Sequence, residues 1–179
     1  MASDMKVVTA EASRLERDLQ SALMRSETRS LARPAKKDVD GNLLVRGVKL
    51  PADLRVLPPA AGTPARCGQF SGGWGGGRWA DVRSVEVWVE TVNSDCSMRI
   101  VYALGGTSIT NGRANFQRVS ASVADGGDVR FRLASGSTIT MRTNSASALE
   151  LSLLDLQGGR YQVELDRLVH DPAQDTGEY

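Results

Sequence analysis

Long apolar runs are missing from this 179-residue sequence, and so is a basic, apolar stretch at its beginning. A membrane-spanning helix needs about 20 mostly apolar residues, and a signal peptide opens with positive charge followed by an apolar region. The sequence therefore predicts neither. Aromatic residues make up 5% and charged residues 24%, with a net charge of +1, which favours one globular core over a disordered chain or a polycationic nucleic-acid binder.

Histidine is almost absent, because His170, near the C-terminus, is the one histidine in the chain. Acid–base and nucleophilic catalysis usually need a group that titrates near neutrality, and histidine is the ordinary source of one. The sequence also lacks a G-x-S-x-G elbow, an H-E-x-x-H motif, a cysteine–histidine quartet and a G-K-[ST] after its glycine run. We therefore expect no enzymatic activity, no cofactor and no metal site.

Glu86 and Glu90 are a pair of carboxylates on the same face of a predicted strand. Residues four apart along a strand are separated by roughly 13 Å, too far for two carboxyl groups to act on one glycosidic bond. We expect this pair to lie on a solvated face.

Cysteine is scarce as well, with Cys67 and Cys96 only. Cys67 lies at the start of the first predicted strand and Cys96 lies in the turn at Asn93–Cys96, so a meander of strands brings both to one end of a barrel. We expect a disulfide, with two buried free thiols as the alternative. A disulfide is typical of an oxidising compartment. We therefore expect a periplasmic or secreted protein whose leader has been removed, and a cytoplasmic location is the alternative.

The N-terminal segment, residues 1–30, carries apolar residues at spacings of three and four, which predicts an amphipathic helix from about Thr9 to Arg29. An isolated helix of this length is marginal in water, so its stripe must pack on the chain's own barrel, on a second copy or on a partner. Residues 31–66 carry five prolines and predict an extended proline-rich arm. Its apolar clusters, at 43–45 and 54–57, are expected to lie on a surface.

Period-two alternation of apolar and polar residues dominates the rest of the chain. It covers residues 85–90, 98–103, 129–133, 138–142, 149–153 and 160–166, and residues 66–79 and 115–123 bring the predicted strands to eight. An open sheet would expose two edges, so we expect an all-β fold, an eight-stranded antiparallel up-and-down barrel at 67–169. A disordered acidic tail is expected at 170–179. The glycines at 72–77 are expected to allow tight curvature or a bulge.

The first strand opens with Cys67, Phe70 and the run Gly72-Gly73-Trp74. This resembles the start of calycin-type barrels, the lipocalin and avidin class, in which a G-x-W on the first strand plugs one barrel end beneath an arginine from the last strand. Gly72 and Trp74 match that motif, and either Arg160 or Arg167 is the arginine. The wider pattern is also similar to a β-module of exported bacterial proteins. The calycin resemblance implies an apolar ligand bound at the open end of the barrel.

Outward positions of the predicted strands carry one tryptophan and many arginines. Trp88 must be covered by the helix, the arm or a partner. Cross-strand pairing with carboxylates accounts for most of the arginines, which are Arg99, Arg118, Arg130, Arg132, Arg142 and Arg160. Arg130, Arg132 and Arg142 also form a basic stripe that is suited to an anionic polysaccharide, a lipid headgroup or a nucleic acid.

The leading hypothesis is an extracytoplasmic interaction module without catalysis, in which the barrel is a rigid scaffold and residues 1–65 bind a protein partner or a second copy. The residues predicted to make that contact are Leu15, Leu19, Leu23, Leu54, Leu57 and Trp88, while Gly72, Trp74 and Trp79 are predicted to be structural. Removal of residues 1–65 is expected to leave a folded barrel. The alternatives are binding of a small apolar ligand and inhibition of a secreted hydrolase by the arm.

Overall fold

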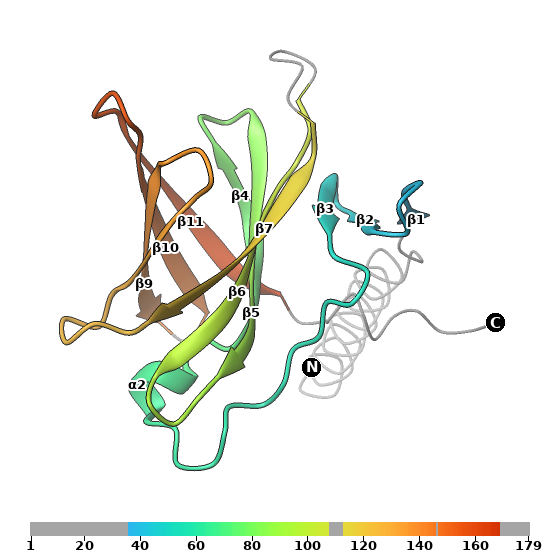
Figure 1. Cartoon of the computed structure of the whole chain (residues 1–179). Helices are drawn as coiled ribbons and strands as arrows, with labels where there is room; N and C mark the ends of the chain where they lie inside the picture. Colours follow the sequence, from blue (N-terminus) through green and yellow to red (C-terminus); the bar gives the residue numbers. More distant parts are fainter. Residues whose placement is uncertain (1–35, 108–112, 146, 169–179) are drawn as a thin grey trace, which may run out of the picture. The chain divides into compact units, whose positions relative to one another are not determined.

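The computed structural model describes residues 36–107, 113–145 and 147–168 (Figure 1). The predicted N-terminal helix with Leu15, Leu19 and Leu23, and the predicted tail with His170, lie outside the described residues. No helix in the described part is long and apolar enough to cross a membrane.

Eight antiparallel strands form the main body, which confirms the predicted strand number and class. Along the sheet their order is β7-β6-β5-β4-β11-β10-β9-β8, so chain neighbours are also sheet neighbours in each half. The strands are β4 (Gly72–Trp79), β5 (Arg83–Val92), β6 (Ser97–Leu104), β7 (Asn115–Ser122), β8 (Val129–Arg132), β9 (Thr138–Ser145), β10 (Ala148–Leu154) and β11 (Arg160–Leu168).

The sheet curls into a nearly closed barrel. The first barrel strand pairs with the last, β4 with β11, with Trp74 opposite Arg167. The outermost strands, β7 and β8, meet at an isolated bridge between Val123 and Val129. Further along this seam the backbone N–H of Ala134 donates to Oε1 of Gln117 at 2.7 Å. Figure 1 shows β9, β10 and β11 facing β5, β6 and β7 across the barrel.

Inward side chains form the main core, as the alternation predicts. Val85, Val87 and Val89 of β5 point into the barrel and are fully buried. Intervening residues of the same strand, such as Trp88, point to the outside. Two tryptophans of β4 are also part of this core, Trp74 near the start of the strand and Trp79 at its end. The barrel interior is therefore packed with its own side chains.

Residues predicted to be an irregular arm contain a second, three-stranded sheet made of β1 (Lys36–Lys37), β2 (Leu43–Val45) and β3 (Val48–Leu50). The turn between β2 and β3 has two residues, Arg46 and Gly47, both with positive φ. Such a turn matches the twist of a tight hairpin. The chain therefore builds a hairpin where the sequence had indicated a linker.

This hairpin covers the outside of the barrel. Leu43, Leu50 and Leu54 form a buried cluster with Trp88 of β5 and Val101 of β6. The outward Trp88 is thus covered by the arm, which is one of the three covers expected for it. Burial of these side chains fixes the arm to the barrel through the hydrophobic effect.

After the hairpin, the extended chain runs beside the last residues of β5, beyond Val89, where the pairing with β4 ends. The backbone N–H of Leu57 donates to the carbonyl of Glu90 at 2.8 Å, and that of Ala60 donates to the carbonyl of Val92 at 2.9 Å. Pro58 and Pro59 lie between these two bonds and have no N–H to donate. The two prolines therefore occupy positions at which the pairing with β5 uses no backbone N–H.

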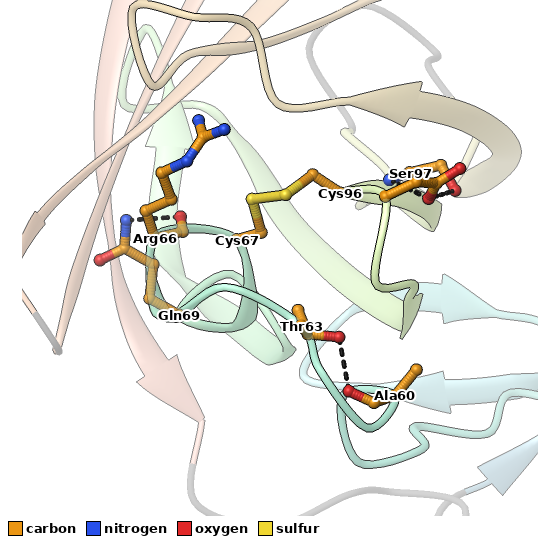
Figure 2. The surroundings of a disulfide bond; sticks show 8 residues. Ala60, Thr63, Arg66, Cys67, Gln69, Cys96 and Ser97 are labelled. Atoms are coloured by element: carbon orange, nitrogen blue, oxygen red, sulfur yellow. Dashed lines mark hydrogen bonds between the residues drawn. A yellow bond between two sulfur atoms is a disulfide. The ribbon is translucent and has the colours of Figure 1, made fainter.

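The helix α2 (Ala65–Gly68) follows and carries Cys67. Cys67 forms a disulfide with Cys96 of the β5–β6 turn, which confirms the predicted pairing over a sequence separation of 29 (Figure 2). Figure 2 shows the disulfide joining α2 to the turn at one end of the barrel. The bond ties the segment before β4 to the β5–β6 hairpin.

The glycine run of β4 makes room for its neighbours, and the register between β4 and β5 shifts between Trp74 and Gly77, as a bulge does. A Cβ at Gly73 would lie 2.5 Å from the Trp88 ring. A Cβ at Gly77 would lie 2.5 Å from Leu165 and 2.8 Å from the carbonyl oxygen of Glu164 on β11. Gly77 is thus needed where the first and last strands approach each other.

We predict that Gly77→Ala lowers the free energy of unfolding by about 1–3 kcal/mol, the usual cost of overpacking. The added methyl group meets backbone, which moves less easily than a side-chain end. Gly126→Ala is the matched control, because nothing lies within 4 Å of a Cβ there. Urea unfolding followed by tryptophan fluorescence measures both, and equal stabilities of the two variants would contradict the steric argument.

Candidate functional site

One end of the barrel is plugged by Trp74. Its indole Nε1 donates to the carbonyl of Phe70 at 2.9 Å, and the guanidinium of Arg167 lies 4.1 Å from the centre of its ring. Arg167 also donates to the carbonyls of Ser71 and Gln69, both at 2.8 Å. Partial burial lowers the pKa of Arg167 below its ordinary value, although a guanidinium stays charged in proteins. Arg167, and not Arg160, is therefore the arginine on the tryptophan, and this end of the barrel is structural.

Glu86 and Glu90 of β5 are buried, so the predicted solvated pair is wrong. The sequence pattern placed them correctly on the outside of the barrel, but the arm covers this face. Glu86 accepts from Nε of Arg46 at 2.7 Å and from Nε1 of Trp88 at 2.9 Å. Burial raises the pKa of Glu86 above its ordinary value, and the bonds from Arg46 and Trp88 lower it in part. Each carboxylate is used to fasten the arm.

We predict that Glu86→Gln changes the pH dependence of stability. Because the folded-state pKa of Glu86 is raised, the native protein holds this proton more tightly than the unfolded chain. Its contribution to the free energy of unfolding is therefore largest at low pH and falls as pH rises from the ordinary glutamate value through the folded-state pKa. Glutamine does not titrate and still accepts from Trp88. The free energy of unfolding of the wild type minus that of Glu86→Gln, measured by urea unfolding from pH 4 to 8, should therefore decrease as pH rises.

Glu164→Gln, at an exposed position of β11, is the control for loss of a surface carboxylate. A difference between wild type and Glu86→Gln that increases with pH would show that the Arg46 ion pair outweighs desolvation, and would contradict the prediction.

Glu90 is the centre of a second ion cluster, and its side chain is completely buried. Its carboxylate accepts from Nε of Arg99 at 2.9 Å and from Nε and Nη2 of Arg118, each at 3.0 Å. Arg118 also reaches Asp53 of the arm, at 2.7 Å. Hydrogen bonds from Arg118 to Glu90, and then to Asp53, raise its pKa. The cluster thus links β5, β6 and β7 to the arm.

The other end of the barrel interior contains a buried polar pair. Nε1 of Trp79 donates to the hydroxyl oxygen of Tyr102 at 2.7 Å. Burial raises the pKa of Tyr102 to about 12, so the hydroxyl keeps its proton near neutral pH. Leu104, Leu153 and Val163 are only partly buried against the same core. This pair satisfies its own hydrogen-bonding groups, and the described residues place no acid–base partner on it.

The outer face of β8–β11 carries a cavity of about 590 Å³. Its polar lining is Arg130, Thr138, Thr140, Ser152, Arg160 and Gln162. Strand register aligns Arg130 with Thr140, Thr140 with Ser152, and Ser152 with Gln162, so these side chains share the outward face. The groove formed by these six residues is called the arginine–hydroxyl groove below. Sequence reasoning missed it, although outward hydroxyls at 138, 140 and 152 were a visible signal.

The predicted basic stripe is only partly free of carboxylates. Nη2 of Arg142 lies 2.8 Å from Asp128, which is the cross-strand pairing that was expected. Nη2 of Arg130 is 3.7 Å from the same carboxylate, and Nε of Arg132 donates to the carbonyl of Gly136 at 3.2 Å. Arg142 is therefore neutralised outside the groove, whereas Arg160, left out of the predicted stripe, lines it.

The predicted contact residues of the arm are divided by the structure. Leu54 and Trp88 are each 1% exposed, in the cluster that joins arm and barrel. Their cover is internal to the chain, which corrects the prediction that they form a surface for a partner. Leu57 is 40% exposed. Among the described residues, no group of three histidine, cysteine, aspartate or glutamate side chains is placed to hold a metal ion.

No protein-family model matches this chain, and no curated protein matches it. Solved structures to which part of this chain is similar include two designed barrels and one natural protein. A designed fluorescence-activating β-barrel shares 21% identity and a TM-score of 0.44, covering 59% of this chain and 100% of its own. A redesigned β-barrel shares 10% identity and a TM-score of 0.46, covering 57% and 95%. The bovine odorant-binding protein in complex with its natural ligand shares 12% identity and a TM-score of 0.37, covering 63% and 78%. The likeness is one of fold alone.

Proposed function

We propose that the chain is a non-catalytic binding module of an oxidising, extracytoplasmic compartment, with a rigid barrel that binds through its outer surface and its N-terminal segment. The supporting observation is the packed interior, where Trp74, Tyr102 and Trp79 are all at most 8% exposed. A barrel filled in this way leaves its outside for recognition. The disulfide between Cys67 and Cys96 supports the compartment, because such bonds persist where conditions are oxidising.

Because the arm packs on the barrel, we do not assign the whole of residues 1–65 to a partner. Removal of residues 1–65 would uncover Trp88 and leave Glu86 and Glu90 without their arm contacts. The expectation that the barrel stays folded after this deletion is therefore revised. We assign partner binding or self-association to the predicted helix within residues 1–30, through Leu15, Leu19 and Leu23.

The test uses the full chain with Leu15→Glu and Leu19→Glu on the predicted apolar stripe. Ser13→Glu with Gln20→Glu is the control, because it adds the same charge away from that stripe. Light scattering after size exclusion measures self-association, and co-purification measures partner binding. The stripe variant should lose association that the control keeps. Equal association of wild type and both variants would reject this role for the helix.

A small apolar ligand in the barrel is the second candidate, favoured by the partly buried Leu104, Leu153 and Val163. Titration with a fluorescent apolar dye tests it. Saturable one-to-one binding that fatty acids displace would support this candidate, and a signal that does not saturate would support the module with a packed interior. Inhibition of a secreted hydrolase is the further alternative, and it requires the arm to reach a protease while docked on the barrel.

A further inference from the structure

The arginine–hydroxyl groove is lined without any carboxylate. Two transverse rows of outward residues meet there. One row is Arg130, Thr140, Ser152 and Gln162, and the next is Arg132, Thr138, Leu154 and Arg160. The row beyond them, towards the plugged end, carries Glu150, Glu164 and the Asp128–Arg142 pair. Asp128 is closer to Arg142, at 2.8 Å, than to Arg130 of the groove, at 3.7 Å. Positive charge is therefore concentrated in one half of this face.

The two lining arginines stand at opposite sides of the groove. Arg130 is on β8 and Arg160 on β11, three strand spacings apart, which is roughly 14 Å. Between them lie the hydroxyl groups of Thr140 and Ser152, on β9 and β10. A ligand that uses both arginines must therefore be elongated, with negative groups at its two sides and hydrogen-bonding groups in its middle.

We propose that this groove binds a short stretch of an acidic polysaccharide. Guanidinium groups bind carboxylates and sulfates through paired, charge-assisted hydrogen bonds. Hydroxyl and amide side chains both donate and accept, which suits the hydroxyl groups of a sugar. The cavity of about 590 Å³ is of the size that holds small ligands, about 300–1,000 Å³. The inference rests on the proposed binding role and gives it a ligand class.

Nucleic acid and membrane fit the groove less well. Single-stranded nucleic acid is bound by aromatic platforms on which the bases stack, whereas Tyr161 is the only aromatic residue among those that line this cavity. A membrane surface is bound by a continuous apolar face that enters the headgroup region, whereas here three hydroxyl side chains and two arginines interrupt the apolar lining of Leu153, Leu154 and Tyr161. The cavity lining therefore favours a hydrated, hydroxyl-rich anion.

The experiment measures binding to the full chain by isothermal titration calorimetry at low salt. The probes are a heparin hexasaccharide, which carries sulfates, and an oligogalacturonate, which carries carboxylates. Maltohexaose is the neutral probe, and oligothymidylate and anionic phospholipid vesicles represent the other classes. We expect one or both acidic sugars to bind, and maltohexaose not to bind. The sugar that binds more tightly identifies the anionic group.

Arg130→Gln and Arg160→Gln should each weaken binding about tenfold, as loss of a charged hydrogen bond does. Thr140→Val, which keeps the side-chain shape, should weaken it about threefold. Arg66→Gln is the control, because it removes an exposed arginine on α2, far along the chain from the groove residues. Thermal unfolding verifies that each variant is folded.

Several results would overturn the proposal. These are no binding of either acidic sugar, tighter binding of oligothymidylate or vesicles, equal binding of maltohexaose, or an equal loss of affinity with Arg66→Gln. None of them bears on the helix-stripe variants or on the apolar dye, so failure of this ligand class can be separated from failure of the proposed module.

Discussion

Trp88→Ala is expected to lower the free energy of unfolding by about 3–5 kcal/mol, the usual cost of truncating a buried tryptophan. Trp88 is 1% exposed and packs with Leu43, Leu50 and Leu54 of the arm. Its Nε1 also donates to the buried Glu86, which loses this partner in the variant. Urea unfolding measures the change in stability, and hydrogen exchange reports on the arm, where residues 43–57 should lose protection before the barrel does.

Leu57→Ala is the control within the same arm. Because Leu57 is 40% exposed, this substitution should lower the free energy of unfolding by less than about 1 kcal/mol. If the arm amides of Trp88→Ala exchange as slowly as those of wild type, apolar packing is not what holds the arm. In that case the ion pairs of Arg46 and Asp53 with the barrel would be sufficient.

The barrel could be predicted because the sequence pattern that specifies each strand lies within that strand and its flanking turns. Inward valines alternate along β5 with the outward Glu86, Trp88 and Glu90, and turn residues separate each strand from the next. One buried face makes the register of such strands specific. The pairing of β4 with β11 followed from a general argument about sheet edges and not from a motif. The alternation with its turns predicted the strand number and order, and the argument about sheet edges predicted the closure.

The arm could not be predicted in the same way, because its strands have only two or three residues each. Segments this short carry no period, and five prolines in residues 31–66 outweighed the hairpin signal at Arg46-Gly47. The error had a further consequence at Glu86 and Glu90. Alternation tells only that a residue points away from the barrel, and whether that face meets water depends on which distant segment covers it.

The groove was missed for a related reason. Its six polar lining residues come from four strands, and each of them alone is an ordinary polar residue on the outward face of a strand. Their common position depends on cross-strand register, such as Thr140 opposite Ser152, which sequence spacing does not fix. The same applies to Arg167, because the β4–β11 register, which places it opposite Trp74, decided between the two candidate arginines.

Removal of the disulfide is expected to lower the free energy of unfolding by about 3–4 kcal/mol, because the bond closes a loop of about 30 residues in the unfolded chain. Cys67 and Cys96 are 0% and 6% exposed, so the bond lies in the core and is shielded in the folded protein. We expect urea unfolding with reductant present to shift the wild-type midpoint to lower urea. The double variant Cys67→Ala and Cys96→Ala should be less stable without reductant and should not respond to it.

A wild-type midpoint that reductant leaves unchanged, with both thiols alkylated after unfolding, would show that the crosslink contributes little. The size of the effect also bears on location. Domains of this kind are stabilised by only about 5–15 kcal/mol in total, so a loss of 3–4 kcal/mol is a large fraction. In a reducing compartment the chain would have to fold without that contribution, while α2 and the β5–β6 turn would lose the bond that joins them. The marginal stability that follows from the loss is the physical reason to expect this barrel to function where disulfides persist.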